Sequence, residues 1–186
     1  MARGAGQGGD GNEPQPAPRR VLEVDPLMDV IDAHEVECIV IGGFAVSAHG
    51  HPRATKDIDI CPSPKKSNLR RLAAALEELE ATPIDLEEFD GEFDLKPDYE
   101  GLQQGGNWTL MTKHGRIDVM QTFSFEDVED ELGEYSDIAG RAVSRELRGR
   151  RFKFCGYEDL LTMKRAAGRP VDEIDIKSLK QARKEL

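Results

Sequence analysis

The sequence predicts an α/β protein, or α+β in stricter usage: a small, mixed, twisted sheet flanked by helices, with a helical part at the C-terminus. Two segments carry this prediction. The apolar run Cys38–Ile41 is rich in β-branched residues, as a buried strand is, and it leads through Gly42-Gly43 into a helical segment at Phe44–His49. After a loop, Asp57–Cys61 alternates acidic and apolar residues, which is typical of a strand with one buried face.

The neighbouring segments supply further strands and the first helices. Pro26–His34 is amphipathic and predicts a short helix beside the first strand. Leucines at helical spacing predict a helix at Leu69–Leu79. Gly105–Met111 and Arg116–Thr122 predict the two strands of an antiparallel hairpin, joined by a turn at His114-Gly115.

The remaining segments have weaker signals. The acidic stretch Glu87–Gly101 lacks regular alternation, so we expect it to be irregular or only weakly strand-forming. Glycine and proline punctuate the end of the chain and separate two helices there. The other expected elements are a helix within Phe123–Leu132, peripheral strands at Tyr135–Val143 and Arg151–Cys155, a helix from Gly156 to Ala167, and a last helix from Pro170 through Arg183.

Length and composition indicate one domain preceded by a tail. Residues 1–20 are rich in Gly, Pro and Gln, which predicts a disordered tail, and residues 21–186 form the expected domain. We expect its core at about 36–125 and its C-terminal flanking strands and helices at about 135–186. Because no apolar run is long enough for a membrane span and no signal-like segment is present, we expect a cytoplasmic protein without membrane association. Cys38, Cys61 and Cys155 are expected to be free thiols.

The charge is strongly negative but uneven. A net charge of −11 argues against a protein that coats nucleic acid non-specifically. The acidic stretch from Glu77 to Glu100 indicates a solvated surface and not a metal site. A later basic run is either a solvated face or a surface for a phosphate-rich substrate such as an RNA end. It consists of Arg141, Arg145, Arg148, Arg150, Arg151 and Lys153.

Asp57 and Asp59 carry the chemical prediction. Residues i and i+2 of a strand point to the same face, so these two carboxylates lie side by side while Ile58 and Ile60 face the core. Two like charges that close are unfavourable unless a cation lies between them, and Mg²⁺ prefers carboxylate and phosphate oxygens. The alternative is an edge or turn pair that makes only surface hydrogen bonds. The Gly42-Gly43 turn upstream favours the metal site, because its backbone N–H groups can approach an anion.

Three separated motifs resemble one known superfamily. Gly42-Gly43 before a helix, followed by Arg53-x-Thr55-x-Asp57-x-Asp59, resembles the nucleotidyltransferases related to DNA polymerase β. Asp118, in an apolar strand after a turn, is similar to the third carboxylate of that superfamily. The segment Asp159–Asp175 looks like the C-terminal helical segment of the AbiEii-type and minimal nucleotidyltransferases, which often occur in toxin–antitoxin pairs. The resemblance covers roughly residues 36–180.

This resemblance implies a polymerase-β-like nucleotidyltransferase fold and a role for each matching residue. Asp57, Asp59 and Asp118 would bind Mg²⁺, with Mn²⁺ as a second candidate. Asp118 would also lower the pKa of the acceptor hydroxyl or take its proton, and Lys164 would act with these three as a catalytic residue. The nucleotide-binding residues would be Gly42, Gly43, Arg53, Thr55, Lys164 and Arg169.

Several of these residues have ordinary alternatives. Arg53 either contacts phosphate or forms a salt bridge with Asp57. Lys164 and Arg169 are also the cations expected near a helix C-terminus, and Asp118 could be a hairpin acid without a role. The serine that usually follows the first glycine in this superfamily is replaced by Gly43, and the Thr55 or Ser47 hydroxyl could compensate. The acids Asp172 and Asp175 would pair with the cations or orient them.

The implied reaction is Mg²⁺-dependent transfer of a nucleoside monophosphate from a nucleoside triphosphate, ATP for example, to a hydroxyl acceptor, with release of pyrophosphate. The acceptor would be a tRNA 3′ end or a protein side chain, in a toxin–antitoxin or phage-defence setting with a cognate partner. One alternative is a small-molecule nucleotidyltransferase that acts on an antibiotic hydroxyl. Another is a catalytically weak or inactive module that binds a nucleotide or a partner, as an antitoxin does.

Overall fold

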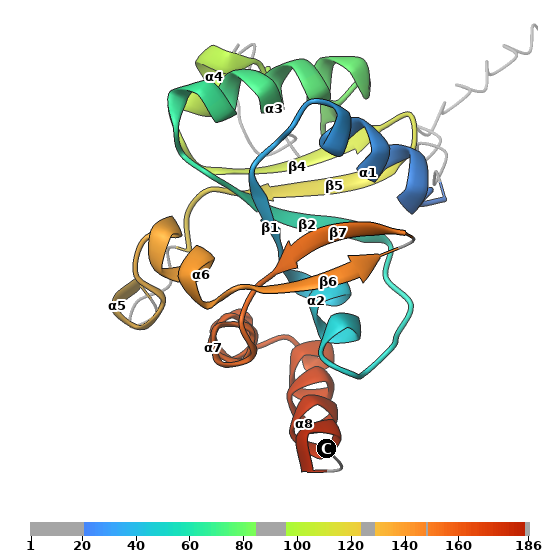
Figure 1. The fold of residues 1–186 in the computed structure, drawn as a ribbon, viewed down its shortest axis with the longest axis vertical. Coiled ribbons are helices and arrows are strands. Elements are labelled where there is room, and N and C mark those ends of the chain that lie inside the picture. Colours follow the sequence, from blue (N-terminus) through green and yellow to red (C-terminus); the bar gives the residue numbers. More distant parts are fainter. Residues whose placement is uncertain (1–20, 85–95, 124–128, 148, 185–186) are drawn as a thin grey trace, which may run out of the picture.

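The structure is a computed structural model and describes residues 21–84, 96–123, 129–147 and 149–184 (Figure 1). The expected tail, residues 1–20, lies outside these ranges. None of the helices in the described ranges has the length and apolar character needed to cross a membrane. The elements are α1 Val24–Ala33, β1 Cys38–Val40, α2 Gly42–Ala48, β2 Asp57–Pro62, α3 Lys66–Glu78, β3 Thr82–Pro83, α4 Tyr99–Gln103, β4 Asn107–Thr112, β5 Gly115–Met120, α5 Glu129–Leu132, α6 Tyr135–Arg141, β6 Val143–Leu147, β7 Arg150–Phe154, α7 Tyr157–Ala167 and α8 Pro170–Lys184.

The strands of the described residues form one seven-stranded mixed sheet in the order β3-β4-β5-β2-β1-β7-β6. Strand β2 runs parallel to β5 and β1 runs parallel to β7, whereas the other neighbours are antiparallel. The predicted β4–β5 hairpin is present, but its turn lies one residue earlier than His114-Gly115, at Lys113-His114, because Thr112 pairs with Gly115. The predicted fold class, a mixed sheet flanked by helices, is therefore confirmed.

The helices lie in two groups with the strands between them (Figure 1). Helix α3 contacts α1, α4 and β2, and helix α7 contacts α2, α5 and α8. The α3 side of the sheet is apolar, because the alternate residues Ile58 and Ile60 of β2 and Ile117 of β5 are fully buried. Since successive residues of a strand point to opposite faces, burial of these isoleucines turns the intervening polar residues to the other face.

Two predictions about individual elements are wrong. The segment from Tyr135 is not a strand but helix α6, and strand β6 begins only at Val143. The helix is favoured by a reciprocal cap, in which the Asp137 carboxylate accepts the Glu134 N–H at 2.9 Å. Strand β7 is not peripheral, because it pairs with β1 inside the sheet.

Two acidic regions were only partly predictable. Helix α4 replaces the end of the expected irregular stretch, and it begins where Asp98 accepts the Gly101 N–H at 2.9 Å. Residues 87–95 of that stretch lie outside the described ranges. Of the helix expected within Phe123–Leu132, the described ranges contain α5, and residues 124–128 lie outside them. The two-residue strand β3 is an addition that the sequence patterns do not indicate.

Gly42 is predicted to be a glycine that cannot be replaced without loss of stability. Its φ is +60°, and a Cβ there would lie 1.9 Å from the Asp59 Oδ2 atom. Gly42→Ala should therefore lower the free energy of unfolding by more than about 2 kcal/mol, from left-handed strain and the clash together. Urea unfolding followed by circular dichroism measures this. Gly140→Ala is the matched control, because its Cβ would meet nothing within 4 Å inside α6, and equal effects of the two substitutions would contradict the prediction.

Candidate active site

The register of two parallel strands brings the three predicted aspartates together. Asp59 of β2 is the direct cross-strand neighbour of Asp118 of β5, and Asp57 lies two residues before Asp59 on the same face. The Asp57 side chain keeps 27% of its surface exposed and Asp118 keeps 13%. The three carboxylates therefore share a half-buried patch on the face opposite the isoleucine core.

Asp59 is the carboxylate whose charged form this arrangement destabilises most. Burial, together with the charges of Asp57 and Asp118, raises its pKa from 3.8 to about 6. The positive charge of Lys164 and a hydrogen bond from the Gly43 N–H act in the opposite direction but do not outweigh them. The patch is therefore short of positive charge.

Arg116 supplies part of that positive charge, and the sequence patterns do not single it out. Its Nε and Nη2 atoms donate to the two Asp118 carboxylate oxygens at 2.9 and 2.7 Å, a bidentate pair. The same Nε lies 3.7 Å from Asp57 Oδ2. Arg116 is the cross-strand neighbour of Asp57, so its place two residues before Asp118 on a strand was the available signal.

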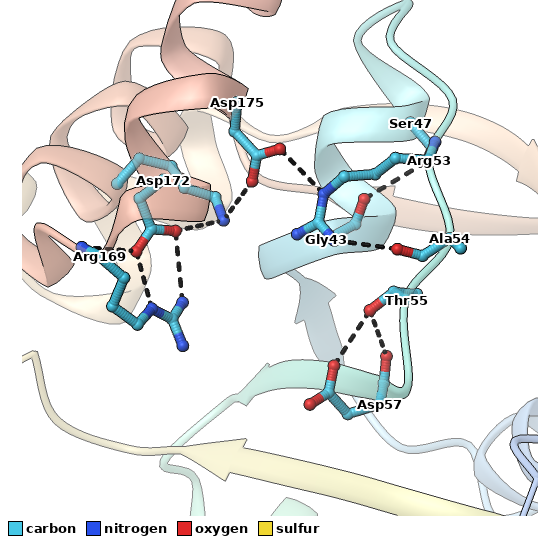
Figure 2. Close-up of polar contacts among 10 residues, drawn as sticks. Gly43, Ser47, Arg53, Ala54, Thr55, Asp57, Arg169, Asp172 and Asp175 are labelled. Atoms are coloured by element: carbon cyan, nitrogen blue, oxygen red, sulfur yellow. Dashed lines mark hydrogen bonds and ion pairs between the residues drawn. The ribbon is translucent and has the colours of Figure 1, made fainter.

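Gly43 and Thr55 occupy adjoining space beside the aspartates. A Cβ on Gly43 would lie 2.8 Å from the Thr55 Oγ1 atom. A serine would therefore not fit here unless Thr55 moved, and the Thr55 hydroxyl lies close to where a serine side chain would start. That hydroxyl donates to the Asp57 Oδ1 atom at 3.0 Å (Figure 2). The other candidate hydroxyl, on Ser47, instead contacts the Gly43 carbonyl oxygen at 3.3 Å.

The predicted cations of the C-terminal helices also lie near the aspartates. Lys164 of α7 is only 4% exposed, and its Nζ lies 2.7 Å from Asp172 and 2.8 Å from Asp175 of α8. Arg169 donates to Asp172 at 2.7 Å, and the charges of Asp59 and Asp57 also act on its guanidinium. Gly168, with φ of +60°, ends α7 in the left-handed conformation and lets the chain turn before α8.

Of the two alternatives for Arg53, the salt bridge with Asp57 is not the one in the structure. Its Nε lies 2.9 Å from the Asp175 Oδ1 atom, and Figure 2 shows the two side chains facing each other across the gap between α8 and the loop after α2. The physical reason is that Asp175 is fully buried, whereas Asp57 is partly exposed. An unpaired buried carboxylate costs more free energy than one that water can still reach. The alternative role, a phosphate contact, stays a prediction.

Other residues named from the sequence have structural partners. The three cysteines are free, as predicted. Within the basic run, Arg141 pairs with Asp159 at 2.9 Å and Arg150 pairs with two acids of α1. Arg151 and Lys153 are exposed on β7. A nucleic-acid surface at this run stays a prediction.

The carboxylate oxygens of Asp57, Asp59 and Asp118 are ligands that suit a divalent cation, although these side chains do not converge on one point. In the described ranges no group of three or more His, Cys, Asp or Glu side chains has the geometry to hold a metal ion as it stands. In the structure the Asp118 carboxylate is paired with Arg116 at 2.7 Å. The raised pKa of Asp59 and a guanidinium already placed between Asp118 and Asp57 both indicate a site that stabilises positive charge.

Comparisons with known proteins identify the fold. No protein-family profile and no curated protein matches the chain. The lincomycin-bound lincosamide antibiotic adenylyltransferase LnuA matches with a TM-score of 0.55 and 16% identity, over 88% of this chain and 99% of LnuA. The antibiotic-resistance factor ANT(2'')-Ia matches with a TM-score of 0.52 and 18% identity, over 86% and 80% of the two chains. The chain has the nucleotidyltransferase fold.

A third match agrees with this. TM1012 from Thermotoga maritima, a protein provisionally assigned as a nucleotidyltransferase, matches with a TM-score of 0.51 and 14% identity, over 90% of this chain and 98% of that one. Likeness at this level of identity concerns the fold, whereas activity depends on the site. None of these three likenesses supports the AbiEii-type branch in particular.

The raised pKa of Asp59 predicts a pH-dependent cost to the metal-free protein. Between pH 3.8 and about 6 the folded state binds the Asp59 proton and the unfolded state does not, so the free energy of unfolding falls as the pH rises through this window. Asp59→Asn should remove the cost. We expect it to raise the free energy of unfolding at pH 7.5 by at most about 3 kcal/mol, with the gain vanishing near pH 4.

Thermal melts in a metal chelator at pH 4 and pH 7.5 measure this gain. Glu77→Gln on the exposed side of α3 is the control and should change little at either pH. A stabilisation of the Asn variant that is the same at both pH values would contradict the predicted titration.

Proposed function

We propose that the protein is a metal-dependent nucleotidyltransferase, which transfers a nucleoside monophosphate from a nucleoside triphosphate to a hydroxyl acceptor. The observation that supports this best is the joint placement of the three carboxylates beside the Gly42-Gly43 turn, with Arg53, Lys164 and Arg169 on the adjoining helices and loop. Carboxylates at one end and cations at the other suit a metal-bound triphosphate.

The carboxylates have distinct roles in this proposal. Asp57 and Asp59 hold Mg²⁺ or Mn²⁺, and Asp118 joins them once its pair with Arg116 opens. The metal, when bound, neutralises charge that develops on the phosphate oxygens. Asp118 takes the proton of the acceptor hydroxyl as the acceptor oxygen bonds to the α-phosphorus and the bond to pyrophosphate breaks. Thr55 keeps the Asp57 carboxylate oriented through its 3.0 Å hydrogen bond.

The nucleotide-binding roles follow from position. Gly42 and Gly43 have no side chains, so phosphate oxygens can approach the turn closely. Arg53 and Arg169 carry fixed positive charge and planar donors suited to phosphate. Lys164 is buried between Asp172 and Asp175, so in this proposal it acts on the site through its charge.

The acceptor and the setting are the least constrained parts. The resemblance to AbiEii-type enzymes favours a tRNA 3′ end or a protein side chain, a toxin–antitoxin or phage-defence role, a cognate partner and a cytoplasmic location. The fold likeness to LnuA and ANT(2'')-Ia, the latter also solved with adenylyl-2''-tobramycin, favours adenylylation of a small hydroxylated molecule. A binding module without activity is favoured by the ion pair of Arg116 with Asp118 and by the absence of the superfamily's serine at Gly43.

Label transfer tests the proposal. The protein is incubated with each α-labelled nucleoside triphosphate, Mg²⁺ and three acceptor pools: total RNA, total protein and a panel of hydroxylated antibiotics. We expect label in one pool and a loss of at least about 10²-fold in Asp57→Asn, which keeps the shape of the side chain but not its charge. Glu77→Gln should transfer label as the wild type does. Nucleotide binding without transfer to any pool would instead favour the binding module, and transfer by Asp57→Asn at the wild-type rate would contradict the assigned site.

A further inference from the structure

A continuous chain of alternating charges crosses the C-terminal side of the site. It runs from Arg53 to Asp175, Lys164, Asp172 and Arg169, with successive distances of 2.9, 2.8, 2.7 and 2.7 Å. The chain joins the loop after α2 to both C-terminal helices. It contains three cations and two carboxylates, so it is positive overall. Its two ends, Arg53 and Arg169, are both guanidiniums.

The two carboxylates of this chain are held very differently. Asp172 accepts well-aligned hydrogen bonds from Lys164 at 2.7 Å and from the Arg169 Nε at 2.7 Å. Asp175 is also fully buried, yet neither of its oxygens has an aligned hydrogen bond, although both face a cation at close range. A buried carboxylate that relies on charge attraction alone is costly to keep, so Asp175 requires an explanation beyond packing.

Arg53 connects Asp175 to the glycine turn. Its Nη2 atom would lie 3.1 Å from a Cβ on Gly43, and its Nη1 donates to the Ala54 carbonyl at 3.0 Å. Figure 2 shows Arg53 between Asp175 on one side and the Gly43 and Ala54 backbone on the other. The Nε atom of the guanidinium thus faces Asp175 of α8, and its Nη2 atom lies beside the Gly43 turn.

Loss of Asp175 would affect the two cations unequally. Lys164 keeps Asp172 as a fully hydrogen-bonded partner. Arg53, in contrast, forms its ion pair with Asp175, and the Arg53 side chain is 24% exposed. Arg53 is therefore the group whose position depends most on Asp175.

We propose that Asp175 is a positioning residue, which fixes the Arg53 guanidinium beside the Gly43 turn so that it binds the triphosphate of the nucleotide. This inference rests on the proposed function for the identity of the ligand. Asp175 does not touch the nucleotide; it sets the place from which Arg53 does. The neighbouring acid Asp172 holds Lys164 and Arg169. Arg53 is held by Asp175 instead.

A double-mutant cycle on phosphate binding tests this. Dissociation constants for magnesium tripolyphosphate are measured by calorimetry for the wild type, Asp175→Asn, Arg53→Gln and the double variant. Each single substitution should weaken binding by about 10- to 100-fold. In the Arg53→Gln background, Asp175→Asn should change the constant by less than about 2-fold, because the residue through which it acts is gone.

A cycle on the same two helices provides the control. Arg183 of α8 pairs with Glu158 of α7 at 2.6 Å, and both side chains are exposed. Arg183→Gln and Glu158→Gln should leave tripolyphosphate binding unchanged. If Asp175→Asn does not fold, Asp175→Glu replaces it in the cycle, because it keeps the charge but displaces it by one methylene, and the same non-additive result is expected.

Three results would overturn the inference: fully additive effects of the two substitutions, unchanged binding in Asp175→Asn, or no tripolyphosphate binding by the wild type. The first would mean that Asp175 acts on general stability and not through Arg53. Because this binding needs no turnover, a non-additive cycle in a protein that transfers no label would contradict the proposed function and still support the positioning role.

Discussion

Repulsion among three carboxylates is the interaction on which the rest of the site depends. Asp57, Asp59 and Asp118 lie on one face of two neighbouring parallel strands, and burial there raises the pKa of Asp59 to about 6. The surrounding residues can be understood as responses to this charge. Arg116 is bound to Asp118 and Thr55 holds Asp57, while Lys164 of α7 and Arg169, just before α8, lie along the adjoining edge. A cation between the carboxylates would relieve the same strain.

The hydrophobic core supplies the rigidity that such a cluster requires. Isoleucines alternate with the acids along β2 and β5 and are fully buried against the helix layer, so the acids cannot turn away from each other. Gly42 closes the other side, since no Cβ fits between its backbone and Asp59. The favourable packing of the core thus offsets the unfavourable repulsion among the carboxylates, as is common at functional sites.

Local patterns could predict the acids but not their partners. The alternation around Asp57 and Asp59 and the turn before Asp118 are visible within a few residues of sequence, and the structure places all three together. The pairs of Arg116 with Asp57 and of Arg53 with Asp175 depend on strand register and helix docking, for the second pair across most of the chain. Helix α6 was missed for a different reason, because its cap is formed by Glu134 and Asp137 and not by the usual Ser or Thr.

The most direct test of a cation site at the three aspartates is anomalous diffraction from crystals grown with Mn²⁺ and a non-hydrolysable nucleoside triphosphate. We expect an anomalous peak within coordination distance of Asp57 and Asp59, about 2.0–2.3 Å from their oxygens, with the Arg116 guanidinium withdrawn from Asp118. Arg116 still bound to Asp118, with Mn²⁺ absent from this face or bound elsewhere, would contradict it.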